Sequence, residues 1–312
     1  MTRHFLTMTD ISSAELSRLL SLAAEIKANP AEYRNRLEGK SIAMIFAKQS
    51  TRTRISFEVG IQQLGGQPLA LSTGGGTGMQ MGRGETIHDT AQVLSRFVHG
   101  IVIRTFAQDD LVGLAEHGSI PVVNALTDQY HPCQALADLL TIKEKKGSLD
   151  GLKIVYAGAG NNVAHSLLLA APMANMNVVC ACPSELYPDS AVVERARTLA
   201  KDAGTTVEVE TDLLKAVDGA DVIYTDTWVS MGEEEEEERL LNILRPYQIT
   251  SAVMGAANEG ALFMHCLPAH RGDEVLNEVM DGPQSVVFDQ AENRLHAQKA
   301  LLALLLGGVS WE

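Results

Sequence analysis

The nine residues from 46 to 54, Phe-Ala-Lys-Gln-Ser-Thr-Arg-Thr-Arg, limit the folds open to this chain more than any other stretch. They end an apolar run that begins at Ile42, and apolar residues then recur at helical spacing as far as the pair Gly65-Gly66. A buried strand, a polar loop and a helix in this order predict an α/β fold. Ser50 is placed to cap the helix, whose N-terminal N–H groups would converge with two arginines on an anion such as a phosphate. The simpler alternative is an ordinary capped helix with solvated arginines.

Strand-like apolar runs that end in polar residues recur along the chain, and most lead into a helical pattern. They begin near positions 69, 99, 121, 152, 221 and 262. Ser12 opens a first helix with a capping box, Thr86 caps another, and residues 297–306 predict a last helix that docks on the fold. A chain of 312 residues is too long for one ordinary core. We expect two doubly wound α/β domains, each with a central, largely parallel sheet flanked by helices, with the change near residues 148–151.

Charge and composition exclude several classes of protein. A formal net charge of −14 argues against binding to nucleic acid, which requires a basic surface. No apolar run reaches about 18 residues and the first residues lack a signal-peptide pattern, so we expect a cytoplasmic protein without a membrane span. Four cysteines in such a chain predict no disulfide framework. Cys180 and Cys182 alternate onto one face of a strand, where core thiols are favoured over a metal pair. We expect neither a metal nor a cofactor.

Polar residues at the predicted strand ends are candidate ligands, because open α/β sheets bind substrates at the carboxyl ends of their strands. Arg104 ends one strand and supplies a further guanidinium for the anion site, or it is a surface arginine. His131 and Gln134 share one face of a helix that starts at Pro132. This pair can polarise a carbonyl and hold an amide, or it can simply cap the helix. Asp226 ends another strand and can receive an ammonium group.

Three further segments have a functional and a simpler interpretation. Residues 73–85 are rich in glycine and form either a functional loop or a linker. Gly158-Ala159-Gly160 lacks the third glycine of a dinucleotide fingerprint, and Cys180 stands where a ribose-binding acid belongs, which disfavours a nicotinamide cofactor. Six glutamates at 233–238 are most simply a solvated face at the start of a helix.

Four segments resemble the signature segments of a known family. They are Ser50-Thr51-Arg52-Thr53-Arg54, His131-Pro132-Cys133-Gln134, Asp226-Thr227-Trp228-Val229-Ser230-Met231-Gly232 and His265-Cys266-Leu267-Pro268. The first two resemble the aspartate and ornithine carbamoyltransferases as a whole, and the last two resemble the members that act on ornithine. The resemblance runs from the first helix to the last, in the family's order. Ala159 stands where the family often has an aspartate, and the glutamate run is longer than we expect there.

The resemblance implies a carbamoyl-phosphate-binding domain over residues 1–131, a linking helix over 132–147 and an ornithine-binding domain over 148–290. The C-terminal helix, residues 291–312, would pack back on the first domain. A homotrimer, or an assembly of trimers, would place active sites at subunit boundaries, where Gln80 reaches into the neighbouring subunit. The implied activity transfers the carbamoyl group of carbamoyl phosphate to the side-chain amine of L-ornithine, in arginine biosynthesis or breakdown.

The resemblance also implies roles for single residues. Direct attack by the amine would pass through a tetrahedral intermediate that Arg104, His131 and Thr53 stabilise. Asp226 would pair with the α-ammonium group, and Cys266 would tune the reacting amine. The carbamoyl phosphate ligands would be Ser50, Thr51, Arg52, Thr53, Gln80, Arg104, His131, Gln134, Cys266, Leu267 and Arg294. The ornithine ligands would be Asn162, Asp226, Ser230 and Met231. Two alternatives are a carbamoyltransferase for another amine, such as putrescine or an acylated ornithine, and an idle phosphate- or dinucleotide-binding regulator.

Overall fold

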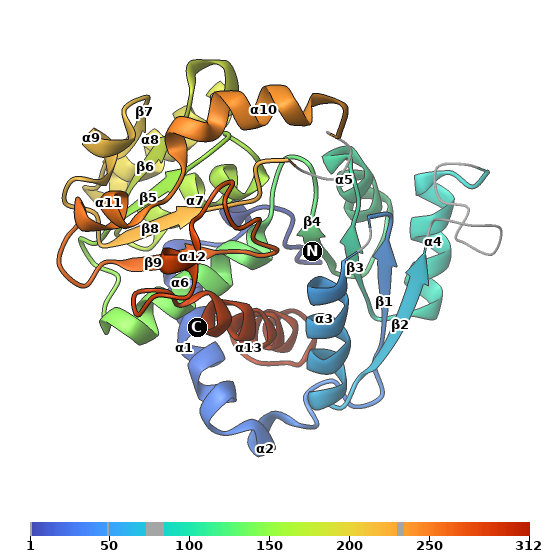
Figure 1. The fold of residues 1–312 in the computed structure, drawn as a ribbon. Helices are drawn as coiled ribbons and strands as arrows, with labels where there is room; N and C mark the ends of the chain where they lie inside the picture. Colours follow the sequence, from blue (N-terminus) through green and yellow to red (C-terminus); the bar gives the residue numbers. More distant parts are fainter. Residues whose placement is uncertain (1, 49, 73–83, 230–233) are drawn as a thin grey trace. The chain divides into compact units, whose positions relative to one another are not determined.

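The computed structural model describes residues 2–48, 50–72, 84–229 and 234–312. The chain forms two compact units, whose elements are drawn in Figure 1. Unit 1 holds Met1–Leu140 together with Asn293–Glu312, and unit 2 holds Thr141–Glu292. The helices α6 (Pro132–Lys146) and α13 (Val287–Leu306) contain the two boundaries, so each of them contributes residues to both units.

Unit 1 is built on a four-stranded parallel sheet with the strand order β2-β1-β3-β4. Its strands are β1 (Ser41–Phe46), β2 (Gln67–Ser72), β3 (Gly100–Arg104) and β4 (Val122–Leu126). Its other helices are η1 (Met8–Asp10), α1 (Ser13–Ala28), α2 (Pro30–Tyr33), α3 (Thr51–Gln63), α4 (Ile87–Phe97) and α5 (Gln108–His117). The strand order reverses between β1 and β3, and ligands of open α/β sheets bind at such a switch point.

Local capping starts the helices of unit 1 where the sequence predicts them. The Ser12 side chain accepts from the backbone N–H of Glu15, and the Glu15 carboxylate accepts from the N–H of Ser12, which is the predicted capping box of α1. The Ser50 side chain accepts from the N–H of Thr53 at the start of α3, and Thr86 caps α4 in the same way. These predictions are confirmed, because a cap depends only on residues within one turn of each other.

Both faces of β1 and β3, the two central strands of the sheet in unit 1, are largely buried. One face packs against α4 and α5 through a cluster that includes Ala43, Ile45, Ile101, Ile103, Leu94 and Leu114. Successive side chains of a strand point to opposite faces, so Ile42, Met44 and Val102 point to the other face, and they are also almost fully buried. Burial on both faces explains why these strands read as continuous apolar runs rather than as alternating patterns.

Unit 2 is built on a five-stranded parallel sheet with the order β7-β6-β5-β8-β9. Its strands are β5 (Lys153–Ala157), β6 (Asn177–Ala181), β7 (Val207–Glu210), β8 (Val222–Thr225) and β9 (Leu262–His265). Its other helices are α7 (Asn162–Met173), η2 (Ser184–Leu186), α8 (Ser190–Ala203), α9 (Leu213–Val217), η3 (Glu234–Glu236), α10 (Glu237–Leu244), η4 (Arg245–Tyr247), α11 (Ser251–Gly255) and α12 (Asn277–Met280). Here the strand order reverses between β5 and β8.

Helices cover the sheet of unit 2 as well. Val155 and Ala157 of β5 pack with Leu213 of α9 and Val253 of α11 in one apolar cluster. The helix α7 lies against β5 and β6 and buries every residue from 163 to 173. The predicted α/β fold with two parallel sheets is confirmed.

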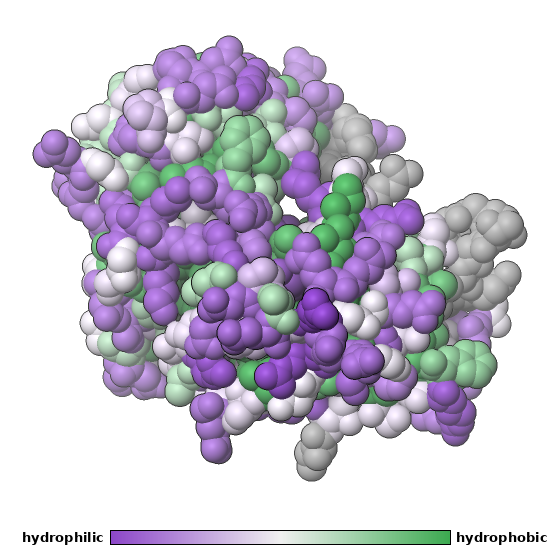
Figure 2. Space-filling model, turned by 90° about the horizontal axis from the view of Figure 1, so that it is seen from below, coloured by the Kyte–Doolittle hydropathy of each residue, from purple (hydrophilic) through white to green (hydrophobic). Residues whose placement is uncertain are grey.

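Hydropathy and exposure bear on how the chain meets solvent. Hydrophilic residues cover most of the face seen in Figure 2, with apolar residues between them. Residues 235–238 of the glutamate run are exposed, as a solvated face requires, whereas Glu233 lies outside the described residues. Within the described ranges, no helix combines the length and the apolar character that a bilayer span requires.

The last helix is longer at its start than the sequence predicts. Helical periodicity predicts residues 297–306, but α13 begins at Val287 and ends at Leu306, and residues 307–312 follow it. Its first turns contain Gln290, Asn293 and Arg294, which are polar and yet buried. These side chains can be buried because each forms a hydrogen bond with a distant part of the chain. Since they are polar, the apolar periodicity of the sequence does not reveal this part of the helix. Arg294 lies in the third turn of α13.

Candidate active site

The predicted anion loop joins β1 to α3 at the switch point of unit 1. Ser50 caps α3 through the N–H of Thr53 at 3.1 Å, and the Thr53 side chain turns inward, with the residue only 1% exposed. Thr51 and Arg52, one and two residues after the cap, are exposed. The first turn of α3 thus presents the positive end of a helix and a guanidinium together, an arrangement that suits a phosphate.

A buried guanidinium connects three helices of unit 1. Arg294 of α13 is 4% exposed, and its Nη1 donates to Oε1 of Gln134 on α6 at 2.7 Å. Its Nη2 donates to Oγ1 of Thr53 on α3 at 3.3 Å. Nε2 of Gln134 donates in turn to Oδ1 of Asp138 at 2.8 Å. These bonds fix two predicted ligands, yet the Thr53 hydroxyl can still donate its hydrogen and the Gln134 oxygen can still accept a second bond.

The strands β3 and β4 bring two more predicted residues to the same edge. Arg104 ends β3 in register with Phe46, the last residue of β1, and is 9% exposed. His131 comes directly before α6 and is buried. Burial is the largest cause that holds the pKa of His131 well below its ordinary value of 6.5. The positive charge of Arg294 lowers the pKa further, followed by those of Arg104 and Arg52. The imidazole is therefore neutral at neutral pH.

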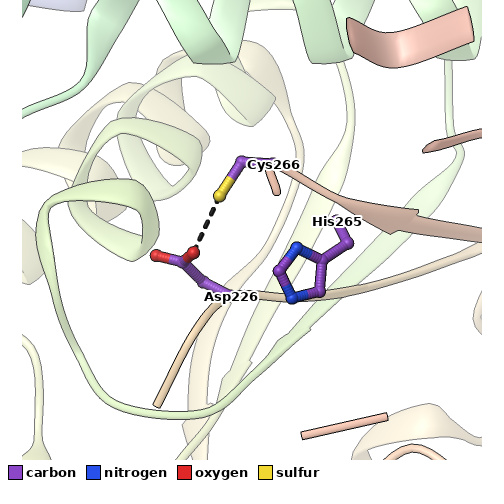
Figure 3. A group of neighbouring side chains, drawn as sticks. All are labelled: Asp226, His265 and Cys266. Atoms are coloured by element: carbon purple, nitrogen blue, oxygen red, sulfur yellow. Dashed lines mark hydrogen bonds between the residues drawn. The ribbon is translucent and has the colours of Figure 1, made fainter. Parts of the chain in front are cut away.

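At the carboxyl edge of unit 2 a carboxylate and a thiol face each other. Asp226 follows β8, and Cys266 follows β9, the adjacent strand. Figure 3 shows the thiol directed at the carboxylate, and Sγ of Cys266 donates to Oδ1 of Asp226 at 2.7 Å. The backbone N–H of Thr227 donates to the same oxygen at 2.8 Å. Asp226 and Cys266 are half-buried, so both remain accessible to a small ligand.

Asn161 belongs to this edge, although the motifs did not single it out. It directly precedes α7, and its Nδ2 donates to Oδ2 of Asp226 at 3.0 Å. An asparagine before a helix predicts a cap, and that was the only signal for this residue in the sequence. Its partner Asp226 is 65 positions away. Asn162, the predicted ornithine ligand, is the first residue of α7 and is half-buried.

Asp226, His265 and Cys266 also lie close enough together to be considered as metal ligands. Figure 3 shows the His265 ring to one side of the bond between the other two. Its Nδ1 accepts from the N–H of Leu267 at 2.8 Å, and its Nε2 lies 3.1 Å from Oε1 of the fully buried Glu274. Both ring nitrogens are thus engaged, which leaves one thiol and one carboxylate, fewer ligands than a zinc site uses. We interpret His265 and Glu274 as support for the loop that carries Leu267, whose φ is +63°.

The glycine loop before α7 is occupied by the chain itself. A Cβ on Gly160 would lie 2.2 Å from the backbone nitrogen of Pro188, and the N–H of Gly160 donates to the carbonyl of Leu186 at 2.7 Å. The close approach that glycine permits therefore serves residues 186–188 and not a pyrophosphate. Cys180 and Cys182 are fully buried, as predicted for core thiols.

Several predicted ligands lie outside the described residues. They are Gln80, Ser230 and Met231, and most of the glycine-rich loop, residues 73–83, lies there too. In unit 1 the structure joins Ser50, Thr53, Gln134 and Arg294 by hydrogen bonds, with Arg104 and His131 at the same edge. In unit 2 it joins Asp226 and Cys266, with Leu267 next in the chain. The roles of these residues toward substrates stay predictions.

Comparison with known proteins gives matches over nearly the whole chain. Residues 3–144 match the family described as "Aspartate/ornithine carbamoyltransferase, carbamoyl-P binding domain", and residues 150–305 match its "Asp/Orn binding domain". The ornithine carbamoyltransferase of Methanobrevibacter smithii is 53% identical over 96% of this chain and 98% of its own length. The ornithine carbamoyltransferase of Thermococcus kodakarensis is 52% identical over 98% and 97%. The solved structure of ornithine carbamoyltransferase from Pyrococcus furiosus superposes with a TM-score of 0.94 at 49% identity, over 99% of this chain and 98% of that one.

Proposed function

Because the chain belongs to the aspartate/ornithine carbamoyltransferase family, we propose that it is an enzyme that transfers the carbamoyl group of carbamoyl phosphate to the side-chain amine of L-ornithine. The products are L-citrulline and phosphate. Relatives that resemble the chain over nearly its full length carry the name ornithine carbamoyltransferase, and this supports ornithine rather than aspartate as the acceptor.

The single observation that carries this choice is the carboxylate of Asp226 at the switch point of unit 2, in contact with Cys266 and Asn161. Ornithine brings two ammonium groups and one carboxylate, whereas aspartate brings one ammonium group and two carboxylates. A carboxylate at the binding edge attracts the ammonium groups of ornithine. It repels the additional carboxylate of aspartate. We assign Asp226 to the α-ammonium group of ornithine and Asn162 to its α-substituents.

The edge of unit 1 suits the other substrate. Carbamoyl phosphate carries a dianionic phosphate, a carbonyl and an amide. The helix cap at Ser50, the hydroxyl of Thr51 and the exposed fork of Arg52 are the proposed phosphate ligands, because arginine can form two parallel hydrogen bonds with a phosphate. Arg294 fixes the side chains of Gln134 and Thr53 through its two hydrogen bonds. The open acceptor position on the Gln134 oxygen can take the carbamoyl N–H, a role that the Leu267 carbonyl would share.

Attack on the carbonyl carbon places negative charge on its oxygen. The proposed donors to this oxyanion are Thr53, Arg104 and His131. Thr53 qualifies because its oxygen already accepts from Arg294, so its hydroxyl hydrogen can point to a ligand. His131 would act as a neutral hydrogen-bond donor. Its pKa is held well below the ordinary value, so the imidazole is neutral at neutral pH and keeps one ring proton. Loss of one such donor typically reduces the rate about 10²–10³-fold.

The acceptor amine must lose a proton before it can attack. With a lysine-like pKa of about 10.4, only about one molecule in 2,500 is neutral at pH 7, a cost of roughly 4.6 kcal/mol. Cys266 is the residue that we assign to the selection of the neutral amine, beside the Asp226 carboxylate that receives the α-ammonium group. The new C–N bond forms and the C–O bond to phosphate breaks. Phosphate leaves with the electron pair and takes up the proton that the attacking nitrogen loses. The carbamoyl donor is already activated, so no cysteine adduct is required. Intact-mass analysis after quenching should show unmodified protein, and a trapped carbamoyl-cysteine would overturn direct transfer.

Some features implied by the family stay predictions. They are the homotrimer, the contribution of Gln80 to a neighbouring site, the contacts of Ser230 and Met231, the cytoplasmic location and the part played in arginine metabolism. Light scattering measures the assembly. A growth test in an arginine-requiring host measures whether the enzyme can supply citrulline for synthesis.

The deciding experiment is citrulline formation by the purified chain. Ornithine with carbamoyl phosphate should give citrulline at a rate well above that of a chain with Asp226→Asn. Putrescine, acetylornithine and aspartate serve as competing acceptors and should react much more slowly. Absence of citrulline above background would end the proposal, and faster carbamoylation of putrescine or acetylornithine would replace ornithine as the acceptor.

A further inference from the structure

The amide of Asn161 is held in one orientation by its surroundings. Its Oδ1 accepts from the N–H groups of Val163 and Ala164 at 3.0 and 3.1 Å, because Asn161 caps α7. The same oxygen accepts from the hydroxyl of Tyr156 at 3.1 Å. Three donors on one side identify that atom as the oxygen, so the NH₂ group must point the other way. It points to Oδ2 of Asp226.

Tyr156 supplies the one side-chain donor of this set from inside the sheet. It lies on β5, is 1% exposed, and has Tyr224 of β8 as its register partner, with ring centroids 5.9 Å apart. Burial raises the pKa of Tyr156 well above its ordinary value, and the charge of Asp226 raises it further. The hydroxyl therefore keeps its proton and stays a donor at any pH at which the protein works.

Both oxygens of Asp226 then have assigned partners. Oδ2 receives Asn161, while Oδ1 receives the thiol of Cys266 and the N–H of Thr227. The carboxylate plane is thus defined from two sides. A rotation of this plane would move Oδ1 away from Cys266 and would turn the face that a substrate ammonium group meets.

We propose that Tyr156 and Asn161 are positioning residues for the acceptor substrate: the Tyr156 hydroxyl locks the Asn161 amide, and the amide holds the Asp226 carboxylate toward Cys266. The proposal rests on the proposed function, because Asp226 is there assigned to the ammonium group of ornithine. It adds a line of three side chains, from the buried Tyr156 on β5 through the half-buried Asn161 that caps α7 to Asp226 at the end of β8. Of the three, only Asp226 would contact the substrate. The line gives Asn161 a role of its own, separate from that of the neighbouring predicted ligand Asn162.

The first test replaces Tyr156 by phenylalanine, which keeps the ring and removes the hydroxyl. A neutral hydrogen bond of this kind corresponds to about a three- to tenfold change in an equilibrium, so the KM for ornithine should rise about three- to tenfold. The KM for carbamoyl phosphate should stay within about twofold of that of the unmodified enzyme. Tyr247→Phe is the matched control, because Tyr247 is also buried in unit 2 and its hydroxyl donates to the carbonyl of Thr211 at 2.7 Å. It should leave both KM values unchanged.

The second test replaces Asn161 by serine, which can still cap α7 but lacks the amide donor. Its KM for ornithine should rise at least as much as that of the Tyr156→Phe variant. If the Tyr156 hydroxyl acts only through the Asn161 amide, its removal has no further effect once the amide is gone. The double variant should therefore have the same KM for ornithine as the Asn161→Ser variant alone. If the two substitutions multiplied each other's effect on the KM for ornithine, the proposed line would be contradicted. An equal rise in the KM values for ornithine and carbamoyl phosphate would contradict it as well.

The third test does not depend on catalysis. Cys266 is half-buried whereas Cys133, Cys180 and Cys182 are buried, so iodoacetamide should modify Cys266 first. The thiol of Cys266 donates to Oδ1 of Asp226 at 2.7 Å, and release of the carboxylate would free the sulfur for the reagent. Alkylation at pH 8 should accelerate about threefold or more in Tyr156→Phe and not in Tyr247→Phe. Unchanged alkylation in both Tyr156→Phe and Asn161→Ser would overturn the positioning role. Missing citrulline formation in the unmodified protein would instead defeat the proposed function alone.

Discussion

Replacement of Arg294 by lysine tests whether its buried fork organises unit 1. The guanidinium reaches acceptors on two helices, Gln134 at 2.7 Å and Thr53 at 3.3 Å. Lysine offers a single ammonium nitrogen in place of a planar fork, so at least one of these buried acceptors loses its charged donor. A hydrogen bond to a charged group contributes about 1.5–3 kcal/mol. The free energy of unfolding should therefore fall by about that amount, and the Tm by roughly 3–10 °C.

Arg271 provides the matched control for this substitution. Its fork donates to both oxygens of Asp281, at 2.8 and 2.9 Å, but the pair is exposed. Exposed pairs contribute about 0–1 kcal/mol, so Arg271→Lys should lower the free energy of unfolding by less than about 1 kcal/mol. Urea unfolding followed by circular dichroism measures both variants. The reasoning is refuted if Arg294→Lys is no more destabilising than Arg271→Lys.

The same variant also has a kinetic signature. Gln134 and Thr53 are the proposed contacts of the carbamoyl group, and both depend on Arg294. The KM for carbamoyl phosphate should rise about tenfold, which corresponds to about 1.4 kcal/mol, while the KM for ornithine should change less than about twofold. Initial rates with each substrate varied in turn measure the two constants. A similar rise in both would indicate a general loosening of the protein and not a loss of specific contacts.

Three further changes probe other parts of the two edges. Arg52→Ala should raise the KM for carbamoyl phosphate and lower turnover without unfolding unit 2. Loss of affinity for ornithine analogues but not for phosphate would show the assignment to be wrong. The depressed pKa of His131 means that the unfolded state binds a proton as the pH falls below about 6.5 while the folded state does not. Stability should therefore decrease by up to about 1.4 kcal/mol per pH unit below that point, and His131→Asn should remove this contribution in unfolding measured at pH 5 and pH 7. Gly160→Ala, whose Cβ would lie 2.2 Å from a backbone nitrogen, should cost about 1–3 kcal/mol and raise the KM for ornithine, whereas Gly255→Ala meets open space and should be neutral in the same thermal unfolding assay.

Features that depend on neighbouring residues could be predicted from the sequence. The caps at Ser12, Ser50 and Thr86 are confirmed because the donor and acceptor of each lie three residues apart. The position of Arg104 at the end of a strand was predicted as well. Its burial was not, because an arginine at a strand end is compatible with solvent until the neighbouring strands are known.

Buried polar residues explain the failure at the last helix. Gln290, Asn293 and Arg294 lie in turns of α13 that precede the apolar pattern of residues 297–306. Arg294 and its partner Gln134 are 160 residues apart, and Asn293 accepts from Lys27 across 266 residues. Polar side chains that are satisfied over such distances look like surface residues in a single sequence. A prediction that assigns every polar residue to the surface will miss helices whose buried face is polar.

The order of the strands decides which predicted residues meet. A parallel sheet gathers the carboxyl ends of its strands at one edge, so the residue after each strand could be named as a candidate from its sequence context alone. The pairing within that edge follows from the order β7-β6-β5-β8-β9, which local patterns do not specify. Asp226 lies beside Asn161 because β8 pairs with β5, and beside Cys266 because β9 pairs with β8. Had β8 paired with β7 instead, the same motifs would leave the carboxylate without its amide. The line of hydrogen bonds from Tyr156 to Asp226 therefore depends on the topology of the sheet. It could be recognised only once the pairing of β5 with β8 was known.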